Sequence, residues 1–384
     1  MTSRERIRRA MSREPVDRVP VMCQFSIGHM LLQLGVSPAE FWCDPGVFAD
    51  GLFAMRAMYD FDGILVSLHG HDPDWRGRIA SRRERDRGEE IVWSDGSSTF
   101  FPRDELPRHT GPDRGGTGGK PAEDVAPSAS VPIDYIPVSQ GLRFRIDPRH
   151  RFDVLERIVA RSAGAYSVHG EITSPFDYVL EHQGYQGALL ALLDDPASVQ
   201  RSLGYFTSRV ILLAERMCRT GIDAIKISSP YAGAGFISPE CYREFVLPSE
   251  RRLISAIRAT GVRAYLHTCG AIRDRLGMMV ESGADGIECL DPPPLGNIEL
   301  EEALGVIGAR CFVKGNVDSV NLLLRGTAPE IREDVGRRVG AGKRSGGFIL
   351  STACSIAPHV PRERVLLLRD AVEPGTVPGS AVRT

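Results

Sequence analysis

The chain has 384 residues, and its 47 lysine and arginine residues nearly balance 49 aspartate and glutamate residues, for a formal net charge of -2. This balance gives no reason to expect nucleic acid, a membrane surface or a polyanionic substrate as the partner. No run reaches the roughly 18 apolar residues of a membrane span, and the polar N-terminal stretch lacks the apolar core of a secretory signal, so we expect a cytoplasmic protein.

Short strand-like runs alternate with helix-like segments along the chain. Two runs lie early, at 18–25 and 61–67, and six follow, at 165–172, 221–228, 262–268, 284–290, 309–316 and 346–352. Helix-like segments lie between the later runs, at 196–219, 239–259, 271–282 and 328–341, and the first two open with a capping residue before proline. Alternating strands and helices predict parallel βαβ units, and eight strands are the number of a (β/α)8 barrel of the TIM type.

Residues 70–150 interrupt this alternation. They contain a hairpin-like run, "EIVWSDGSSTFF", with Asp95 and Gly96 at its turn, and then a glycine-, proline- and serine-rich stretch that cannot bury a core. We interpret 70–150 as an insertion after the second strand of one domain that spans 1–384. Long insertions in barrels usually lie at the catalytic end. We therefore expect the loop 103–130 to cover the site, with a tolerated insertion of no function as the alternative.

One motif carries candidate chemistry, the run "LHTCG" at the end of the fifth strand. His267 and Cys269 stand at i and i+2, so both side chains point to one side of an extended chain. Cys354 follows the eighth strand, whose end faces the same barrel mouth. One histidine and two thiolates suit Zn²⁺, and three protein ligands leave a fourth position open. From the residues alone, an ordinary strand end and a Cys-His nucleophile with its base remain alternatives.

The eight cysteines follow no disulfide-like pattern, so reduced thiols are the expectation. Most of them are expected to be small buried residues, because free cysteine is among the most buried residue types. We therefore consider a catalytic or metal-binding role only for cysteines that have a polar partner at metal-ligand spacing.

Two segments resemble the uroporphyrinogen decarboxylase superfamily, in particular its branch of methylcobalamin:coenzyme M methyltransferases. They are "FISPECYREFVLPSERRLISAIRATGVRAYLHTCG" and "FVKGNVDSVNLLLRGTAPEIREDVGRRVGAGKRSGGFILSTACS". The resemblance covers most of 160–372 and fades in 70–150. It implies a zinc site at His267, Cys269 and Cys354 that presents a small thiol as a thiolate to a methyl donor. The donor would be a corrinoid such as methylcobalamin on a partner protein, because the chain has no D-x-H-x-x-G corrinoid motif.

Further site residues are expected around this motif. Glu288 stands where related cobalamin-independent methionine synthases carry a glutamate ligand, so the resemblance implies a fourth metal ligand. A hydrogen-bond partner of a ligand, or a buried acid held by backbone amides, are the alternatives for Glu288. The residues expected to contact the substrate lie at or near other strand ends, where ordinary structural roles are the alternative, and they are His69, His71, Glu171, Tyr231 and Asn316.

Departures from the family pattern limit the reaction. The segment after the first strand has no arginine and Asp72 lies beyond the usual place, so decarboxylation of a porphyrinogen is not expected. Ser229 stands where many of the methyltransferases carry an acidic residue, which leaves the head group of the substrate open. The other reactions considered are demethylation in the reverse direction and another zinc-thiolate transferase or lyase step such as epoxide opening. A non-catalytic zinc-binding subunit and a homo-oligomer also remain open.

Overall fold

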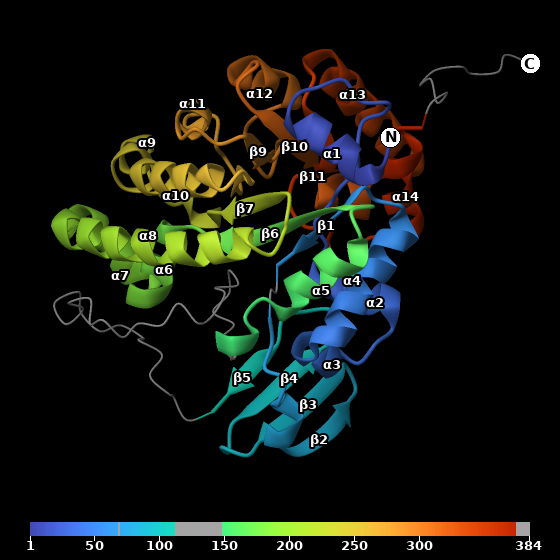
Figure 1. Ribbon diagram of the computed structural model, residues 1–384, viewed down its shortest axis with the longest axis vertical. Helices are drawn as coiled ribbons and strands as arrows, with labels where there is room; N and C mark the ends of the chain where they lie inside the picture. Colours follow the sequence, from blue (N-terminus) through green and yellow to red (C-terminus); the bar gives the residue numbers. More distant parts are fainter. Residues whose placement is uncertain (68–69, 112–147, 374–384) are drawn as a thin grey trace, which may run out of the picture.

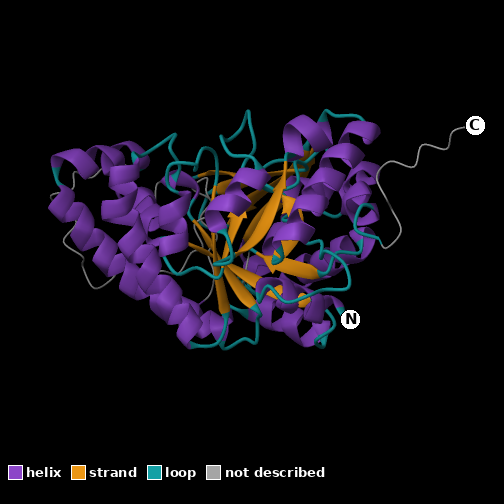
Figure 2. Ribbon diagram, turned by 90° about the horizontal axis from the view of Figure 1, so that it is seen from above, coloured by secondary structure: helices purple, strands orange, loops and turns teal. Residues whose placement is uncertain are grey.

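The computed structural model describes residues 1–67, 70–111 and 148–373. Within these ranges, seven parallel strands form one curved sheet surrounded by helices, as Figures 1 and 2 show. Neighbouring strands pair in chain order, and they are β1 (Gly63–Val66), β6 (Ser167–Thr173), β7 (Ala224–Ser228), β8 (Arg263–Thr268), β9 (Gly286–Cys289), β10 (Phe312–Val317) and β11 (Phe348–Thr352). Each strand falls within or next to one of the predicted runs, which confirms the α/β barrel-type fold.

The helices that connect these strands lie mainly on the outside of the sheet. The longer ones are α1 (Ser3–Met11), α2 (Ile27–Leu34), α3 (Pro38–Cys43), α4 (Pro45–Tyr59), α5 (Asp153–Ser162), α6 (Pro175–Gln183), α7 (Tyr185–Asp194), α8 (Pro196–Cys218), α10 (Leu247–Ala259), α11 (Leu276–Glu281), α12 (Leu300–Ile307), α13 (Ala328–Ser345) and α14 (Arg362–Asp370). Shorter or irregular helices are η1 (Trp75–Arg78), η3 (Pro148–His150), η4 (Pro230–Ala232), α9 (Pro239–Cys241), η5 (Tyr242–Val246) and η6 (Ser319–Leu324). The expected caps are present, because Asp195 and Ser238 accept hydrogen bonds from the first turns of α8 and α9. None of the helices in the described ranges combines the length and apolar character that crossing a bilayer requires.

The predicted strand at 18–25 is not a regular strand, and in this respect the prediction was wrong. Val21 and Phe25 form only isolated parallel bridges, to Leu350 of β11 and to Ile356. Pro20 explains part of the irregularity, since proline has no backbone N–H to donate to a neighbouring strand. On the other side, the backbone N–H of Asp62, just before β1, donates to the carbonyl of Val21 at 2.8 Å. The segment therefore lies between the two edge strands of the sheet and closes the barrel.

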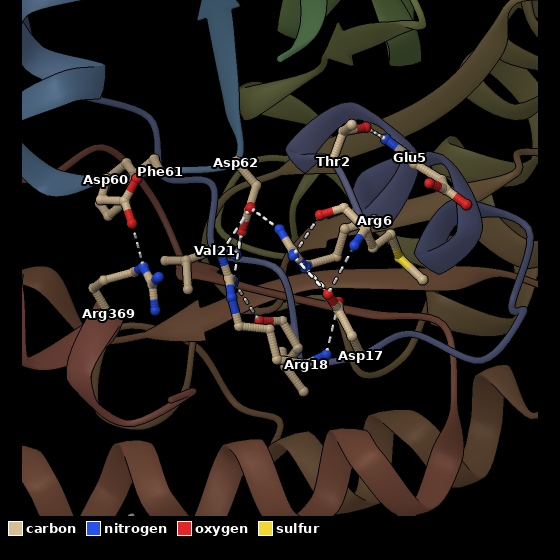
Figure 3. Close-up of polar contacts among 12 residues, drawn as sticks. Thr2, Glu5, Arg6, Asp17, Arg18, Val21, Asp60, Phe61, Asp62 and Arg369 are labelled. Atoms are coloured by element: carbon tan, nitrogen blue, oxygen red, sulfur yellow. Dashed lines mark hydrogen bonds and ion pairs between the residues drawn. The ribbon is translucent and has the colours of Figure 1, made fainter. Parts of the chain in front are cut away.

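A buried carboxylate holds this closure together, as Figure 3 shows. Asp62 is fully buried. Its Oδ1 accepts from Arg6 at 2.6 Å, and its Oδ2 accepts from Arg18 at 2.8 Å and from the backbone N–H of Val21 at 2.9 Å. The carboxylate thus joins α1, the closing segment and the start of β1 through charge-assisted hydrogen bonds.

Helix α1 covers the amino ends of the strands. Its apolar residues Ile7, Ala10 and Met11 belong to a buried cluster with side chains that include Tyr265 and Phe312, from the interior of the barrel. This end of the barrel is therefore filled by a packed helix. Any site open to a substrate is expected at the carboxyl ends of the strands, where barrel enzymes carry their active sites.

The insertion forms a separate antiparallel sheet below the barrel in Figure 1. Its strands pair in the order β2 (Ile79–Arg85), β3 (Gly88–Trp93), β4 (Ser98–Pro102) and β5 (Arg108–Thr110). The expected hairpin corresponds to β3 and β4, and Gly96 at its turn has a φ of 82°, a backbone conformation that favours glycine. Of the expected covering loop 103–130, residues 112–130 lie outside the described residues.

Candidate active site

His267, Cys269 and Cys354 converge at the carboxyl ends of β8 and β11. The Nε2 atom of His267 lies 3.2 Å from Sγ of Cys269, and the two sulfur atoms are 4.0 Å apart. All three candidate ligand atoms lie within 4.8 Å of one another. Two thiolates on one tetrahedral zinc ion would be about 3.8 Å apart, given Zn–S bonds of about 2.3 Å. The donor atoms and their spacing therefore fit one zinc ion.

Glu288 of β9 fixes the imidazole from the other side. Its Oε2 lies 2.9 Å from Nδ1 of His267, the ring nitrogen that does not face the thiols. Glu288 is 2 % exposed and forms ion pairs with two buried lysines, Lys226 at 3.6 Å and Lys314. Burial raises the pKa of Glu288, but the two ammonium groups outweigh it and hold the pKa well below its ordinary value.

The position of Glu288 matches the alternative that the sequence left open, a hydrogen-bond partner of a ligand. The described group with metal-ligand spacing contains His267, Cys269 and Cys354 but not Glu288. A carboxylate on Nδ1 fixes the tautomer in which Nε2 carries the free lone pair. Glu288 thereby orients His267 toward the two sulfur atoms.

The thiols differ in acidity. Hydrogen bonds from the thiols of Cys289 and Cys354 hold the pKa of Cys269 well below its ordinary value, against the effect of burial. The hydrogen bond to Cys269, together with burial, raises the pKa of Cys354. Cys269 therefore ionises first and is the stronger candidate for the first thiolate of the site.

A cavity of about 600 Å³ adjoins this cluster. Ser355, which follows Cys354, and Ser228, which pairs with His267 in the sheet, both line it. Glu171 of β6 also lines the cavity and forms an ion pair with Lys226 at 3.1 Å. Residues 104–108 of the insertion, which follow β4 and include the first residue of β5, form part of its wall. The insertion thus contributes to the site from the carboxyl side of the barrel.

The structure separates the expected substrate contacts into two groups. Glu171 and Tyr231 line the cavity. Asn316 does not, because its amide donates to the carbonyl of Leu290 at 2.8 Å and accepts from Arg338 of α13. His71 is buried against Phe48, with ring centroids 5.6 Å apart, and burial lowers its pKa to about 4. His69 lies outside the described residues.

Several site residues were not expected from the sequence. Lys226 and Lys314 are charged residues in the middle of apolar strand runs, "AIKIS" and "FVKGN", and this interruption is the signal that could have found them. Cys289 and Asp291 also lie near Cys269, with a second metal-ligand spacing that includes Cys269. Asp291 accepts a hydrogen bond from the backbone N–H of Gly270 at 2.6 Å and so fixes the turn after Cys269.

Two buried carboxyl groups lie near the cavity, and one of them, Asp177, lines it. Asp177 of α6 accepts hydrogen bonds from the hydroxyls of Ser174 at 2.5 Å and Ser229 at 3.3 Å, and burial raises its pKa to about 7. Glu250 of α10 accepts from Tyr242 at 2.5 Å, and burial, with a contribution from Asp177, raises its pKa to about 8. Ser229 stands where an acidic residue was expected from the resemblance, and here a carboxylate from α6, that of Asp177, lies beside it.

Replacing Glu250 by glutamine is expected to flatten the pH dependence of folding stability. The pKa of Glu250 is about 8 in the folded protein and 4.5 ordinarily, so the folded chain keeps a proton that the unfolded chain gives up. This contribution to stability is complete below pH 4.5 and is lost as the pH rises through 8. Between about pH 5.5 and pH 8.5 the wild type should lose about 3 kcal/mol more than Glu250→Gln in urea unfolding.

The matched control is Glu244→Gln, an exposed carboxylate one and a half turns earlier on the same helical segment. It should keep the wild-type slope of unfolding free energy against pH. Equal slopes for Glu250→Gln and the wild type would show that Glu250 is ionised at neutral pH in the folded state.

Comparisons with known proteins agree with this arrangement. The family model of Uroporphyrinogen decarboxylase (URO-D) matches residues 144–374. The chain is 27% identical over 169 residues to the methylcobamide:CoM methyltransferase MtaA of Methanosarcina barkeri, covering 44% of this chain and 47% of that protein. It is 26% identical over 211 residues to a methylated-thiol–coenzyme M methyltransferase of Methanosarcina mazei, covering 55% and 54%. It is 28% identical over 193 residues to a uroporphyrinogen decarboxylase of Rhodococcus erythropolis, covering 48% and 51%.

These matches span about half the length of the curated relatives. A solved structure, described as a methyltransferase from Methanosarcina mazei, covers 97% of this chain and 98% of its own with a TM-score of 0.72 at 20% identity, and this likeness concerns the fold. Because the family model spans more than half of the sequence, the chain belongs to the uroporphyrinogen decarboxylase (URO-D) family.

Proposed function

We propose that the protein is a zinc-dependent methyltransferase. In this proposal, His267, Cys269 and Cys354 hold Zn²⁺, and a small thiol takes the fourth position. The methyl group moves between the thiol sulfur and a corrinoid carried by a partner protein, in either direction. The observation that carries the proposal is the convergence of one imidazole and two thiols within 4.8 Å beside an open cavity. The methylcobamide:CoM methyltransferase relatives support the same reaction class.

A zinc ion, when bound, lowers the pKa of a coordinated thiol so that it is a thiolate at neutral pH. The chain supplies the rest of the site. Glu288 keeps the proton of His267 on Nδ1, so that Nε2 faces the sulfur atoms. Lys226 and Lys314 compensate the charge of Glu288 in a region closed to water. These contacts hold the three donor atoms in place before any substrate enters.

The cavity gives the thiol a defined approach. Residues 104–108 of the insertion form part of its wall, and Glu171 on the wall is linked through Lys226 to Glu288. A substrate that enters from the cavity reaches the strand ends that carry the two cysteines. Partial exclusion of water at this point strengthens the attraction between a metal ion and a thiolate.

Decarboxylation of a porphyrinogen is disfavoured by the charge of the cavity. The carboxylates that line it are Asp104, Glu105, Glu171, Asp177 and Glu181, whereas Arg108 is the lining arginine. A tetrapyrrole substrate of a decarboxylase carries several carboxylates of its own, and like charges repel strongly where water is scarce. This observation favours methyl transfer over the reaction of the decarboxylase relatives.

The proposal is tested on the purified full-length chain. We expect close to one zinc per chain by mass spectrometry, and loss of the methylcobalamin absorbance only when a thiol is added. X-ray absorption at the zinc edge should gain a sulfur neighbour at about 2.3 Å on addition of that thiol. A zinc-containing protein whose metal spectrum does not respond to any thiol would instead be a non-catalytic zinc-binding subunit. Thiol addition to an epoxide without methylcobalamin consumption would favour the other zinc-thiolate chemistry.

A further inference from the structure

Two carboxylates on one face of α6 line the cavity without a cationic partner among the described residues. Asp177 and Glu181 stand at i and i+4, so they lie one turn apart on the same side of the helix. Their side-chain donors among the described residues are hydroxyl groups, of Ser174 and Ser229 to Asp177 and of Tyr185 to Glu181, and the backbone N–H of Tyr231 also acts on Asp177. Like charges at this spacing destabilise a helix, and a cation beside them would relieve this repulsion.

One oxygen of Asp177 accepts no hydrogen bond of standard geometry from the described residues, although the backbone N–H of Tyr231 acts on the carboxylate and lowers its pKa. The side chain is 3 % exposed, and its Oδ2 accepts both serine hydroxyls. Its Oδ1 is buried and accepts no hydrogen bond of normal geometry from the described residues. A buried acceptor without a donor costs about 1–3 kcal/mol. Since Asp177 lines the cavity, a donor or cation that occupies the cavity would remove this cost.

The other carboxylates of the cavity already have cations beside them. Glu171 is paired with Lys226 at 3.1 Å. Asp104 lies 3.6 Å from Arg87, and Glu105 is paired with Arg108. Among the described residues that line the cavity, the carboxylates without a cation beside them are therefore the two on α6. An anionic head group, such as a sulfonate or carboxylate, would meet repulsion at this wall.

Aromatic rings complete the same wall. Tyr185 and Tyr231 both line the cavity, with ring centroids 4.8 Å apart and planes inclined by 55°. The hydroxyl of Tyr185 donates to Glu181 at 2.6 Å, which fixes this ring against α6. Phe25 and Trp42 contribute further rings to the lining. Aromatic faces beside carboxylates form the environment that binds organic ammonium groups.

We infer that the cavity takes a small organic cation, whose ammonium group lies against Asp177 and Glu181 and the rings of Tyr185 and Tyr231. This inference rests on the proposed function and narrows its substrate class, because the cation is then carried by the thiol that accepts the methyl group or by a methylated ammonium compound. The volume of about 600 Å³ lies within the range of small-molecule sites. A cation next to Asp177 also favours the ionised form of a carboxyl group whose pKa burial raises to about 7.

Two matched ligand pairs test the inference by calorimetry on the full-length protein. The first pair is choline and its uncharged isostere 3,3-dimethylbutan-1-ol. The second pair is 2-aminoethanethiol and 2-mercaptoethanesulfonate, which carry the same thiol with opposite charges. We expect at least one cation to bind tenfold or more tightly than its counterpart. Binding of choline would identify a methylated ammonium ligand, and binding of 2-aminoethanethiol alone would identify a cationic thiol.

Variants link this binding to α6. Asp177→Asn should weaken binding of the preferred cation about tenfold or more. Glu181→Gln should also weaken this binding. Because position 181 is less buried, the second variant tests the inference even if Asp177→Asn does not fold. The control Asp194→Asn makes the same charge change at an exposed position at the end of α7 and should bind like the wild type. Cation binding that is unchanged in both α6 variants would overturn the inference, and so would equal affinity within each ligand pair.

The choline arm separates this inference from the proposed function. Choline has no thiol and needs no zinc, so its binding should persist in a Cys269→Ser variant. Persistent choline binding in a protein without methyl transfer would leave the cation site standing and the proposed reaction refuted. Thiol-dependent methyl transfer with a preference for 2-mercaptoethanesulfonate would support the proposed reaction and refute the cation site.

Discussion

Replacing Cys269 by serine is expected to lower the affinity for zinc at least about a hundredfold and to abolish thiol-dependent methyl transfer. Cys269 is the central member of the candidate cluster, since its sulfur lies 3.2 Å from Nε2 of His267 and 4.0 Å from Sγ of Cys354. Structural zinc sites contribute about 10–16 kcal/mol in all, so one of a few ligands accounts for about 3 kcal/mol or more. A serine hydroxyl at this position does not ionise at neutral pH and cannot replace the thiolate.

Zinc content after dialysis against a chelator of known affinity measures this effect directly. The matched control is Cys241→Ser, which makes the same exchange on α9, outside the described metal-ligand groups, and should keep the wild-type zinc content. Cys354→Ser should behave like Cys269→Ser, because it removes the other sulfur. Full zinc occupancy in both variants would refute a site built on the two thiols.

Replacing Asp62 by asparagine is expected to cost about 3–5 kcal/mol of the free energy of unfolding, which is the usual effect of removing one partner of a buried ion pair. Asp62 is fully buried and accepts from two guanidinium groups, those of Arg6 and Arg18, whose side chains are 8 % and 10 % exposed. Asparagine has the same shape but no charge, so Arg18 loses its ionic partner among the described residues and Arg6 keeps only Asp17, in a region where water cannot replace the lost charge. Figure 3 shows these contacts and the hydrogen bond from the backbone N–H of Val21 to Asp62 at the barrel closure.

Urea unfolding at neutral pH provides the measurement, with Asp60→Asn as the control two positions earlier. The side chain of Asp60 is 56 % exposed, and its ion pairs with Arg56 and Arg369 lie at the surface. Exposed pairs of this kind contribute about 0–1 kcal/mol. An Asp62→Asn protein that unfolds within 1 kcal/mol of the Asp60→Asn protein would mean that the closure is held by packing rather than by charge.

The barrel was predictable because its strands are apolar runs separated by capped helices, and these signals are local. It was also predictable that the side chains of His267 and Cys269 point to the same side of the chain, since residues at i and i+2 share one face of a strand. The irregular segment at 18–25 was not, because its pairing depends on Leu350 and Asp62, which are far away in the sequence. Pro20 was a local warning against a regular strand.

The roles of single polar residues depended on partners from other elements. Asn316 lies at the end of a strand, as expected, but the carbonyl of Leu290 and the guanidinium of Arg338 occupy its amide. For Glu288 the sequence left a metal ligand and a hydrogen-bond partner of a ligand open, and its contact with Nδ1 of His267 and its ion pairs with Lys226 and Lys314 depend on three other strands. Asp177 was missed because a carboxylate near the start of a helix is usually a helix-dipole or capping residue, and its burial follows from Ser229 and the fold around it.

The closure of the barrel also bears on how the chain is made in the cell. Residues 18–25 leave the ribosome well before their partners in β11 and at Ile356, which follow all the other strands of the sheet along the chain. During translation the sheet can therefore grow strand by strand from β1 while its two edges stay unpaired. Unpaired edges are templates for association with other chains. The barrel can therefore close only after β11 has been made, and until then the edges of the growing sheet stay open to such association.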